Sequence, residues 1–250
     1  MLNRLFRNKE TPLPPADWSV LKADMHSHLI PGIDDGSQNM DQTIAMLAKF
    51  ESLGYQKIVT TPHIMSDYFK NTPEIILGGL KNVQETAQKL GLKIQIEAAA
   101  EYYFDDAFIK WLQNKEELLT FGDRFLLFEF SFHEPPAQAD AMVFEMITQK
   151  YQPILAHFER YTYYLGSLDR ARELRERGVN IQVNINSLTG HYGPAIKKQA
   201  ELLVDEKLID FLGSDCHRIE HLMKIEQAAT LPYVHKALEL PLKNASLIAS

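Results

Sequence analysis

Two histidines separated by one residue stand where a strand-like run gives way to a turn. They are His26 and His28 in the segment DMHSH (24–28), which follows WSVLKA and precedes LIPGIDDGSQN. Neutral imidazole is a common ligand of Zn, Mn and Fe. Two polar residues at the mouth of a strand are the other interpretation, and the rest of the chain has to decide between them.

Further ligand-type residues recur near the ends of strand-like runs. Glu101 and Glu129 lie in or beside the apolar segments IEAAAEYYF and FLLFEFSF. A buried carboxylate without a counter-charge is unfavourable or takes up a proton, and metal coordination removes that cost. Each such residue, taken singly, is most often solvated or hydrogen-bonded. Taken together, and with no thiolate among them, they favour Mn, Fe or Zn hydrolytic chemistry. The set comprises His26, His28, His63, Glu101, Glu129, His157, Asp215 and His217.

The elements that must position these side chains alternate along the chain. Helical periodicity marks five segments between the strand-like runs, at 40–54, 73–91, 137–150, 167–178 and 193–207. Alternation of strands and helices predicts parallel strands joined by crossovers, in an open doubly wound sheet or a barrel. A barrel gathers the carboxyl ends of its strands around one axis, so the recurring ligand-type residues favour the barrel. Seven runs are predicted as strands, at 18–26, 56–63, 92–101, 124–131, 152–159, 179–186 and 208–215.

Composition limits the classes of function. The 250 residues are 45% hydrophobic and no Ser/Gly/Pro-rich linker divides them, so we expect one domain over 1–250, with residues 1–17 as a lead-in. The formal charge of −7 argues against a general nucleic-acid-binding surface. A single cysteine, Cys216, excludes an intrachain disulfide. With no secretory signal pattern and no run long enough for a membrane span, we expect a cytoplasmic protein.

The ordered motifs carry a resemblance to a known family. DMHSH, the DDG turn, TTPH, AAEYY, LFEFS, LAHFERY and GSDCH follow one another over residues 24–217. This series resembles the PHP superfamily of metal-dependent phosphoesterases, and more narrowly its bacterial protein-tyrosine-phosphatase branch, associated with capsule and exopolysaccharide synthesis. The resemblance implies an α/β fold, a distorted seven-stranded (β/α)7 barrel like a TIM barrel, that holds three divalent metal ions. Mn is favoured, with Fe, Zn or Mg as alternatives.

The resemblance also assigns the ligands. It implies that Glu101 bridges the first and second ions and that Asp35, not Asp34, is a ligand, although an Asp-Gly turn alone would be read as an ordinary turn. The first ion takes His26, His28, Glu101 and Asp215; the second takes Glu101, Glu129 and His157; the third takes Asp35, His63 and His217.

Arg160 and Cys216 are the other residues with candidate chemistry. Arg160, three residues after His157, is placed to clamp phosphate oxygens in a bidentate fork, and a surface salt bridge is its other interpretation. Cys216 lacks the CxxxxxR loop of cysteine-dependent phosphatases, because Leu222 stands where the arginine would be. We therefore interpret Cys216 as a packed small hydrophobic residue.

Three functions compete at this stage. The first is a tyrosine phosphatase acting on the tyrosine-rich tail of a bacterial tyrosine kinase. The second is a small-molecule phosphatase of the superfamily, such as one for histidinol phosphate, or a phosphodiesterase. The third is a non-catalytic binding module, which an intact ligand set disfavours. The sequence carries no signal for an oligomeric state.

Some residues depart from the family pattern or admit two roles. Ile64 and Met65 follow His63 where many relatives carry arginine or polar residues, and Arg218 follows His217 directly instead of lying further on. We expect these departures to alter substrate orientation. Five tyrosines are predicted either to stack on a phosphotyrosine ring or to pack the rim: Tyr102, Tyr103, Tyr161, Tyr163 and Tyr164.

Overall fold

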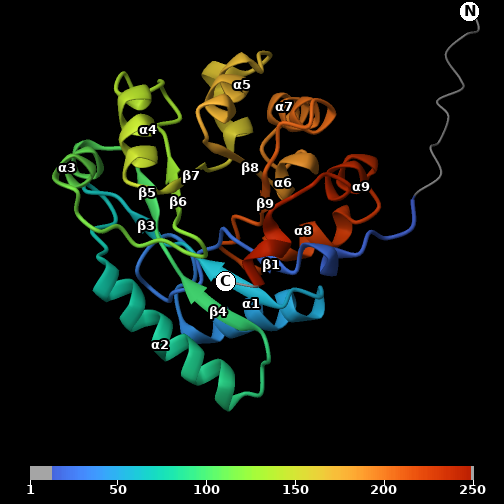
Figure 1. Ribbon diagram of the computed structural model, residues 1–250. Helices are drawn as coiled ribbons and strands as arrows, with labels where there is room; N and C mark the ends of the chain where they lie inside the picture. The colour runs from blue at the N-terminus through green and yellow to red at the C-terminus, as the bar shows by residue number, and fades with distance from the viewer. Residues whose placement is uncertain (1–12, 249–250) are drawn as a thin grey trace, which may run out of the picture.

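The computed structural model describes residues 13–248, so the first twelve residues of the predicted lead-in lie outside the described part (Figure 1). Strands occupy the centre of the molecule and helices surround them. The strands are β1 (Ala23–Asp24), β2 (Lys57–Thr60), β3 (His63–Ile64), β4 (Gln95–Ala98), β5 (Glu101–Tyr103), β6 (Phe125–Glu129), β7 (Gln152–Leu155), β8 (Asn180–Asn184) and β9 (Phe211–Gly213).

The strands form two sheets in which every pair is parallel. One sheet has the order β1-β2-β4 and the other β3-β5-β6-β7-β8-β9. The α/β class with parallel strands is therefore confirmed. The predicted count of seven strands is not reproduced, because residues 13–248 contain nine strands in sheets of three and six. Two predicted runs are each interrupted by two residues, between β2 and β3 and between β4 and β5.

Helices connect the strands on the outside. The five predicted helices are present with shorter bounds, and four further α-helices within residues 13–248, α3, α6, α8 and α9, were not predicted. The α-helices are α1 (Met40–Ser52), α2 (Pro73–Lys89), α3 (Asp106–Asn114), α4 (Ala139–Thr148), α5 (Asp169–Glu176), α6 (Ile185–Leu188), α7 (Pro194–Asp205), α8 (Ile219–Ala228) and α9 (Pro232–Leu238). Side-chain caps explain several starts: Asn39 accepts from the backbone of Gln42, and Thr72 precedes a proline at the first helical position.

Short 3-10 helices shorten some predicted strands. The run 18–26 begins as η1 (Trp18–Leu21), because the Asp17 side chain accepts a hydrogen bond from the backbone of Ser19 and caps a helical turn. The run 152–159 ends at Leu155 and continues into η2 (Phe158–Arg160), followed by η3 (Thr162–Tyr164). The run 179–186 likewise gives way to α6 at Ile185.

The core has two parts. A large cluster fills the space between strands and helices, whereas a smaller one gathers alternate strand residues that face away from those helices. The smaller cluster includes Val59, Leu127 and Phe211, and lies on the opposite strand face from Ile58, Leu126 and Leu212. Strand β8 contributes no residue to the smaller cluster, because its corresponding positions carry amides.

The first and last strands meet through side chains. The Asp24 carboxylate accepts hydrogen bonds from the Ser214 backbone and hydroxyl, both at 2.8 Å. A parallel bridge joins Ser27 to Cys216 beyond the ends of β1 and β9. Asn244, in η4 (Asn244–Ile248), donates to the carbonyl of Ala23 and bonds both backbone groups of Leu212. Residues near the two ends of the described chain therefore close the structure.

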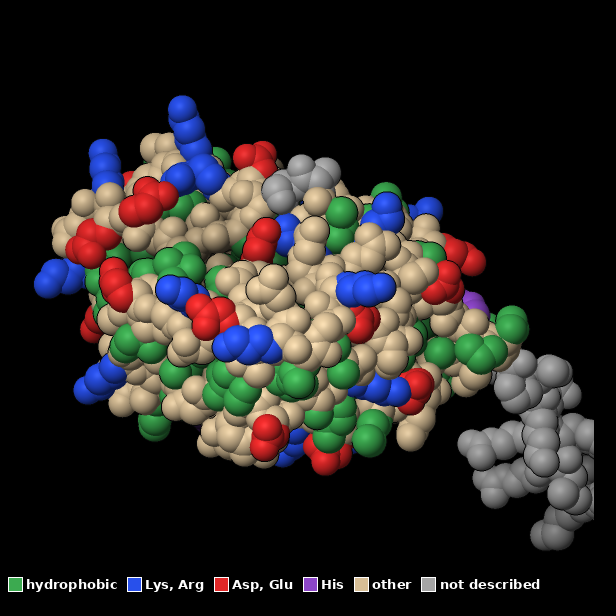
Figure 2. All heavy atoms as spheres, turned by 90° about the horizontal axis from the view of Figure 1, so that it is seen from below, with side chains coloured by type: hydrophobic (Ala, Val, Ile, Leu, Met, Phe, Trp, Pro, Cys, Tyr) green, Lys and Arg blue, Asp and Glu red, His purple; other side chains and the backbone are tan. Residues whose placement is uncertain are grey.

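The face seen from below Figure 1 mixes lysine, arginine and acidic side chains among apolar ones (Figure 2). This face has no single-sign stripe of the kind that follows a nucleic-acid backbone. None of the helices within residues 13–248 combines the length and apolar character that a membrane crossing requires.

Candidate metal centre

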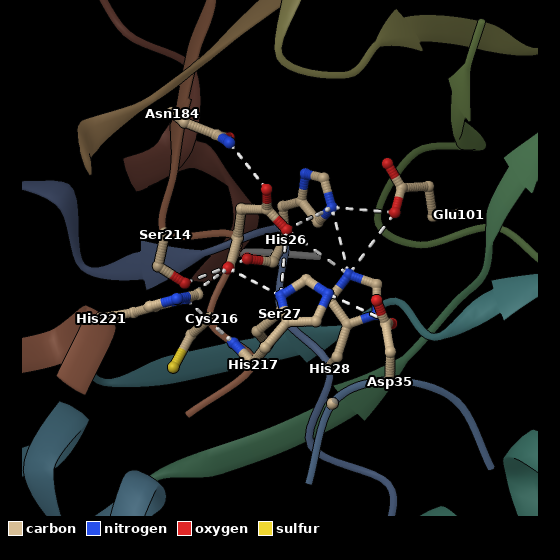
Figure 3. Close-up of polar contacts among 12 residues, drawn as sticks. His26, Ser27, His28, Asp35, Glu101, Asn184, Ser214, Cys216, His217 and His221 are labelled. Carbon is tan, nitrogen blue, oxygen red and sulfur yellow. Dashed lines mark hydrogen bonds and ion pairs between the residues drawn. The ribbon is translucent and has the colours of Figure 1, made fainter. Parts of the chain in front are cut away.

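Glu101 belongs to a buried cluster of histidines and carboxylates, and its carboxylate faces the rings of His26 and His28 (Figure 3). Its Oε2 atom is 3.1 Å from His26 Nε2, 3.4 Å from His28 Nε2 and 3.2 Å from His63 Nδ1. Despite these neighbours, Oε2 is buried and makes no well-formed hydrogen bond within the described residues. A buried oxygen that faces three imidazole nitrogens without a well-formed hydrogen bond belongs to a donor set that fits divalent metal ions.

The segment after β1 supplies the first two histidines. His26 Nδ1 lies 3.0 Å from Gln182 Oε1, and His28 Nδ1 lies 2.8 Å from Asp34 Oδ2. Each ring is thus held through its Nδ1 atom, and the Nε2 atoms of both rings face Glu101 and Asp215. A carboxylate or amide behind a ligating imidazole sets its tautomer and orientation in metal sites.

Asp34 and Asp35 point in different directions. Asp34 is buried, bonds His28 and accepts from the backbone of Gly36, so it supports the site from behind. The Asp35 side chain is 56% exposed, and its Oδ1 atom lies 3.5 Å from His63 Nε2 and 3.3 Å from His217 Nε2. Asp35 therefore faces the cavity together with two histidines.

A second group of side chains follows β5, β6 and β7. His157 Nε2 lies 3.1 Å from Glu101 Oε1 and 3.6 Å from Glu129 Oε2. His63 Nδ1 lies 3.2 Å from Glu129 Oε1. The Nδ1 atom of His157 is buried and has no hydrogen-bond partner among residues 13–248, which is a further sign of an incomplete polar site.

Asp215 is held on both oxygens. Its Oδ1 atom lies 3.5 Å from His26 Nε2, while Oδ2 accepts from Asn184 Nδ2 at 2.7 Å and from Arg160 Nη1 at 3.0 Å. Asp215 and His157 both adopt positive φ, at 48° and 35°. Such conformations are unfavourable for residues other than glycine and cluster at functional sites.

Arg160 lines the cavity, where its guanidinium lies beside two aromatic rings. Its guanidinium carbon lies 4.6 Å from the ring centroid of Phe132 and 4.5 Å from that of Tyr192. Together with the bond to Asp215, these contacts fix the guanidinium beside the cluster. Arg160 does form a salt bridge, but with a buried partner, Asp215, and its role toward phosphate stays a prediction.

The electrostatics of the cluster are those of opposite charges in a buried site. Burial lowers the pKa of His26, but the carboxylates of Glu101 and Asp215 outweigh it and raise that pKa to about 10. Burial raises the pKa of Asp215, yet His26, His217 and Arg160 outweigh it and hold the pKa well below its usual range. The metal-free cluster therefore binds protons where a metal ion would place positive charge.

The structure brings together all nine predicted ligands, and their role as metal ligands stays a prediction. Ligand atoms gather in three sets, each within 4.8 Å: His28, Asp35, His63 and His217; His26, His28 and Glu101; His63, Glu101 and Glu129. The grouping differs in detail from the assignment implied by the resemblance, since His28 also joins the third-ion set and His63 the second-ion set. The donor types and the orphaned buried atoms fit divalent ions.

Several residues of the site were missed by the sequence analysis. Gln182 and Asn184 are buried amides that alternate with apolar residues along strand β8, which was a readable signal. Phe132 and Tyr192 carried no comparable signal, because they contact Arg160 from other parts of the chain. Asp34 lies only six residues from His28, but its sequence is that of an ordinary turn.

The contacts of three of the tyrosines and of Cys216 show whether each side chain packs in the core or faces the cavity. The Tyr102 and Tyr161 hydroxyls accept from the backbones of Leu119 and Phe130, so both rings pack in the core. Cys216 is fully buried with Sγ 3.5 Å from Met46 Sδ, as interpreted from the sequence. Tyr103 lines the cavity.

Comparison with known proteins places these motifs in a family. Residues 22–239 match the family described as capsular polysaccharide synthesis, CpsB/CapC. The chain belongs to the CpsB/CapC family. Among CpsB/CapC relatives, it is 32% identical to CapC of Staphylococcus aureus over 232 residues, covering 90% of each protein. It is 27% identical to the tyrosine-protein phosphatase CpsB of Streptococcus pneumoniae, covering 88% of this chain and 90% of the relative.

Solved structures support the same fold. A structure described as YwqE from Bacillus subtilis and CpsB from Streptococcus pneumoniae, metal-dependent tyrosine phosphatases, has a TM-score of 0.78 at 24% identity and covers 91% of both chains. An amidohydrolase from Mycoplasma synoviae has a TM-score of 0.54 at 14% identity, covering 95% of this chain and 92% of that one. The resemblance read from the motifs, to the capsule-associated tyrosine-phosphatase branch, is confirmed by the CpsB/CapC match.

Proposed function

We propose that this chain is a metal-dependent protein-tyrosine phosphatase that hydrolyses phosphotyrosine in a capsule or exopolysaccharide system. The observation that carries the proposal is the position of Glu101 Oε2, which faces three imidazole nitrogens without a well-formed hydrogen bond in the described structure. A cluster of cations can neutralise the charge of a phosphomonoester during hydrolysis, and this arrangement is suited to hold one.

Three divalent ions, with Mn favoured, would occupy the cluster. His26, His28, Glu101 and Asp215 would hold the first ion, Glu101, Glu129 and His157 the second, and Asp35, His63 and His217 the third. Bound ions of this kind supply a water of lowered pKa as the nucleophile and neutralise charge on the transferring phosphoryl group. Gln182 and Asp34 fix the orientation of the His26 and His28 rings through hydrogen bonds to their Nδ1 atoms.

Arg160 would act on the phosphate from the side of Asp215. Its Nη1 atom bonds Asp215 Oδ2, and the plane of the guanidinium is held between Phe132 and Tyr192. A guanidinium fixed in this way can donate to phosphate oxygens and stabilise the charge that builds on them in the transition state.

The cavity above the cluster supports an aromatic phosphate ester. Its volume is about 620 Å³, and four aromatic side chains line it: Phe69, Tyr103, Phe132 and Tyr192. An aromatic lining provides contact area for a tyrosyl ring, which a phosphoserine side chain would not use. The relatives named tyrosine-protein phosphatases agree with this substrate class. The physiological substrate would be the tyrosine-rich tail of a bacterial tyrosine kinase in the cytoplasm.

We further propose that the whole chain forms one PHP-type domain, a distorted seven-stranded barrel. The two-residue breaks between β2 and β3 and between β4 and β5 leave seven strand-bearing segments. The bridge of Ser27 with Cys216 supports closure of the first segment on the last.

A substrate panel tests the function. The Mn-loaded protein is given a phosphotyrosine peptide, the matched phosphoserine peptide, histidinol phosphate and a phosphodiester, and released phosphate or cleaved ester is measured. We expect the phosphotyrosine peptide to have the highest kcat/KM. Higher kcat/KM for histidinol phosphate or the diester would replace the tyrosine-phosphatase assignment by a small-molecule or phosphodiester one. Glu101→Gln is the matched inactive control.

A further inference from the structure

Beside the metal centre, the wall of the cavity carries positive charge that the proposed ligands do not use. Arg218, at the start of α8, and His191, in the loop between α6 and α7, both line the main cavity. Lys224, six residues after Arg218 on α8, reaches the same loop, where its Nζ atom lies 2.6 Å from His191 Nδ1. Two segments distant in the sequence thus bring these three side chains together.

The hydrogen bonds among these side chains determine which of their nitrogens can donate to a ligand. Because His191 Nδ1 accepts from the Lys224 ammonium, the proton of the neutral ring is on Nε2, which makes His191 a donor with a cation behind it. Arg218 donates from Nε to His221 Nε2 at 3.2 Å, and His221 is anchored through Nδ1, 3.2 Å from the carbonyl oxygen of Asp215. The terminal nitrogens of Arg218 make no hydrogen bond or ion pair to other described residues and can donate to a ligand.

The two cations have no acidic partner in the part of the chain that the structure describes. Lys224 is only partly exposed, and its ammonium bonds the neutral ring of His191 instead of a carboxylate. A neighbouring cavity of about 340 Å³ shares His191 with the main one and includes no carboxylate in its lining, which comprises Thr189, Gly190, His191, Lys224, Gln227, Ala228 and Leu231. Glu220 lines another cavity together with Arg218 and Asp35, but neither carboxylate forms an ion pair with Arg218 among residues 13–248.

We propose that His191, Arg218 and Lys224 form a second anion subsite, which binds a negatively charged residue flanking the phosphotyrosine. This inference rests on the proposed function, since it names the substrate class of the same site. A phosphotyrosine seated over the metal centre places its neighbours along the cavity wall, where a carboxylate or a second phosphate meets the Arg218 guanidinium and the His191 donor, with the Lys224 ammonium behind the imidazole.

Three phosphotyrosine peptides of equal length test the subsite. They carry glutamate, glutamine or a second phosphotyrosine at the flanking positions, and kcat/KM is measured at low and high salt with Mn-loaded protein. We expect the glutamate peptide to exceed the glutamine peptide by about tenfold at low salt, mainly through KM, and high salt to reduce the ratio, because partly exposed charges are screened. A larger ratio for the doubly phosphorylated peptide would identify phosphate, rather than carboxylate, as the preferred anion.

The variants are compared through this ratio within each protein. Lys224→Gln and Arg218→Gln should each bring the glutamate-to-glutamine ratio towards one, whereas Lys224→Arg should retain it. Lys81→Gln, at an exposed position on α2, is the matched control and should keep the wild-type ratio. Equal kcat/KM for all three peptides in the wild type, or an unchanged ratio in both glutamine variants, would overturn the subsite alone. Hydrolysis of none of the peptides would overturn the proposed function and this inference with it.

Discussion

Arg160 donates from Nη1 to Oδ2 of Asp215 over 3.0 Å, while Oδ1 of the same carboxylate faces His26. Arg160 and His26 therefore contact different oxygens of the Asp215 carboxylate. Arg160 is therefore placed to contact a phosphate without being needed to hold the metal.

Replacement of Arg160 should lower turnover more than affinity. Arg160→Ala should cost about 2–4 kcal/mol of transition-state stabilisation, because a donor to the developing charge is lost, and Arg160→Lys should recover only part of it. Metal content should stay unchanged, since Asn184 still holds Asp215. The check is kcat and KM on a phosphotyrosine peptide beside metal analysis. Near-normal kcat in Arg160→Ala, or loss of its metals, would rule out the role.

Gln182 should be needed for tight metal binding although it is not a proposed ligand. Its Oε1 atom holds His26 Nδ1 and accepts from the backbone of His157, so it orients two proposed ligands. Gln182→Met removes both bonds at similar volume and should weaken metal affinity by about 10–100-fold. Titration of the metal-free protein with Mn measures this. Gln84→Met, at an exposed position on α2 whose side chain donates to the carbonyl of Ile96, is the control.

Asp34 and Asp35 should respond differently to substitution. Asp35→Ala removes a cavity-facing ligand and should lower the metal content by about one ion per chain. Asp34→Asn leaves the ligands in place but disturbs His28, so it should weaken affinity while saturating metal still fills the site. Elemental analysis at low and saturating Mn separates the two outcomes. If Asp34→Asn lost an ion at saturation and Asp35→Ala kept all, the assignment of Asp35 would be wrong.

Cys216 should be dispensable for catalysis. Burial raises the pKa of its thiol well above the usual range, so the nucleophilic thiolate is not available. We expect Cys216→Ala to retain turnover, whereas a chelator should abolish activity and added Mn should restore it. Phosphate release before and after each treatment is the measurement. A chelator-resistant wild type, or an inactive Cys216→Ala that still binds its metals, would contradict the metal mechanism.

Asp24 should make the metal-free protein less stable as pH rises. Burial raises its pKa to about 7, against 3.8 for an exposed aspartate, so the folded state keeps a proton that the unfolded state releases between these values. Stability from this group is full below about pH 4 and falls towards pH 7, by an amount on the order of 3–4 kcal/mol. Asp24→Asn can donate to Ser214 at every pH and should flatten this part of the curve. Denaturant unfolding from pH 4 to 7.5 tests this, and parallel curves for both proteins would refute it.

The parts of the fold that could be predicted are those encoded locally. The helix periodicities and the apolar strand runs located five helices and most strands, and the ligand-type residues at the run ends located the cluster. Strand β1 was the weakest case, because Asp17 caps a 3-10 turn within the predicted run 18–26. The helix α8 was missed although its residues Arg218 and His221 approach the site.

The residues that hold the ligands in place could be predicted only in part. Gln182 and Asn184 alternate with apolar residues in β8, a signal that was missed, and their partners are 156 and 31 residues away in the sequence. Asp34 could not be distinguished from an ordinary turn residue, since its function depends on the direction in which His28 points. Pair geometry of this kind arises from the tertiary fold and not from spacing.

The closure between the first and last strands has a kinetic consequence. Asp24 and Ser214 are 190 residues apart, and the site that they flank draws on strand ends from both sides of this junction. Contacts of such sequence separation slow folding, because the chain must lose the entropy of a very long loop to form them. The cluster therefore has its complete geometry only once the two ends of the strand order have met.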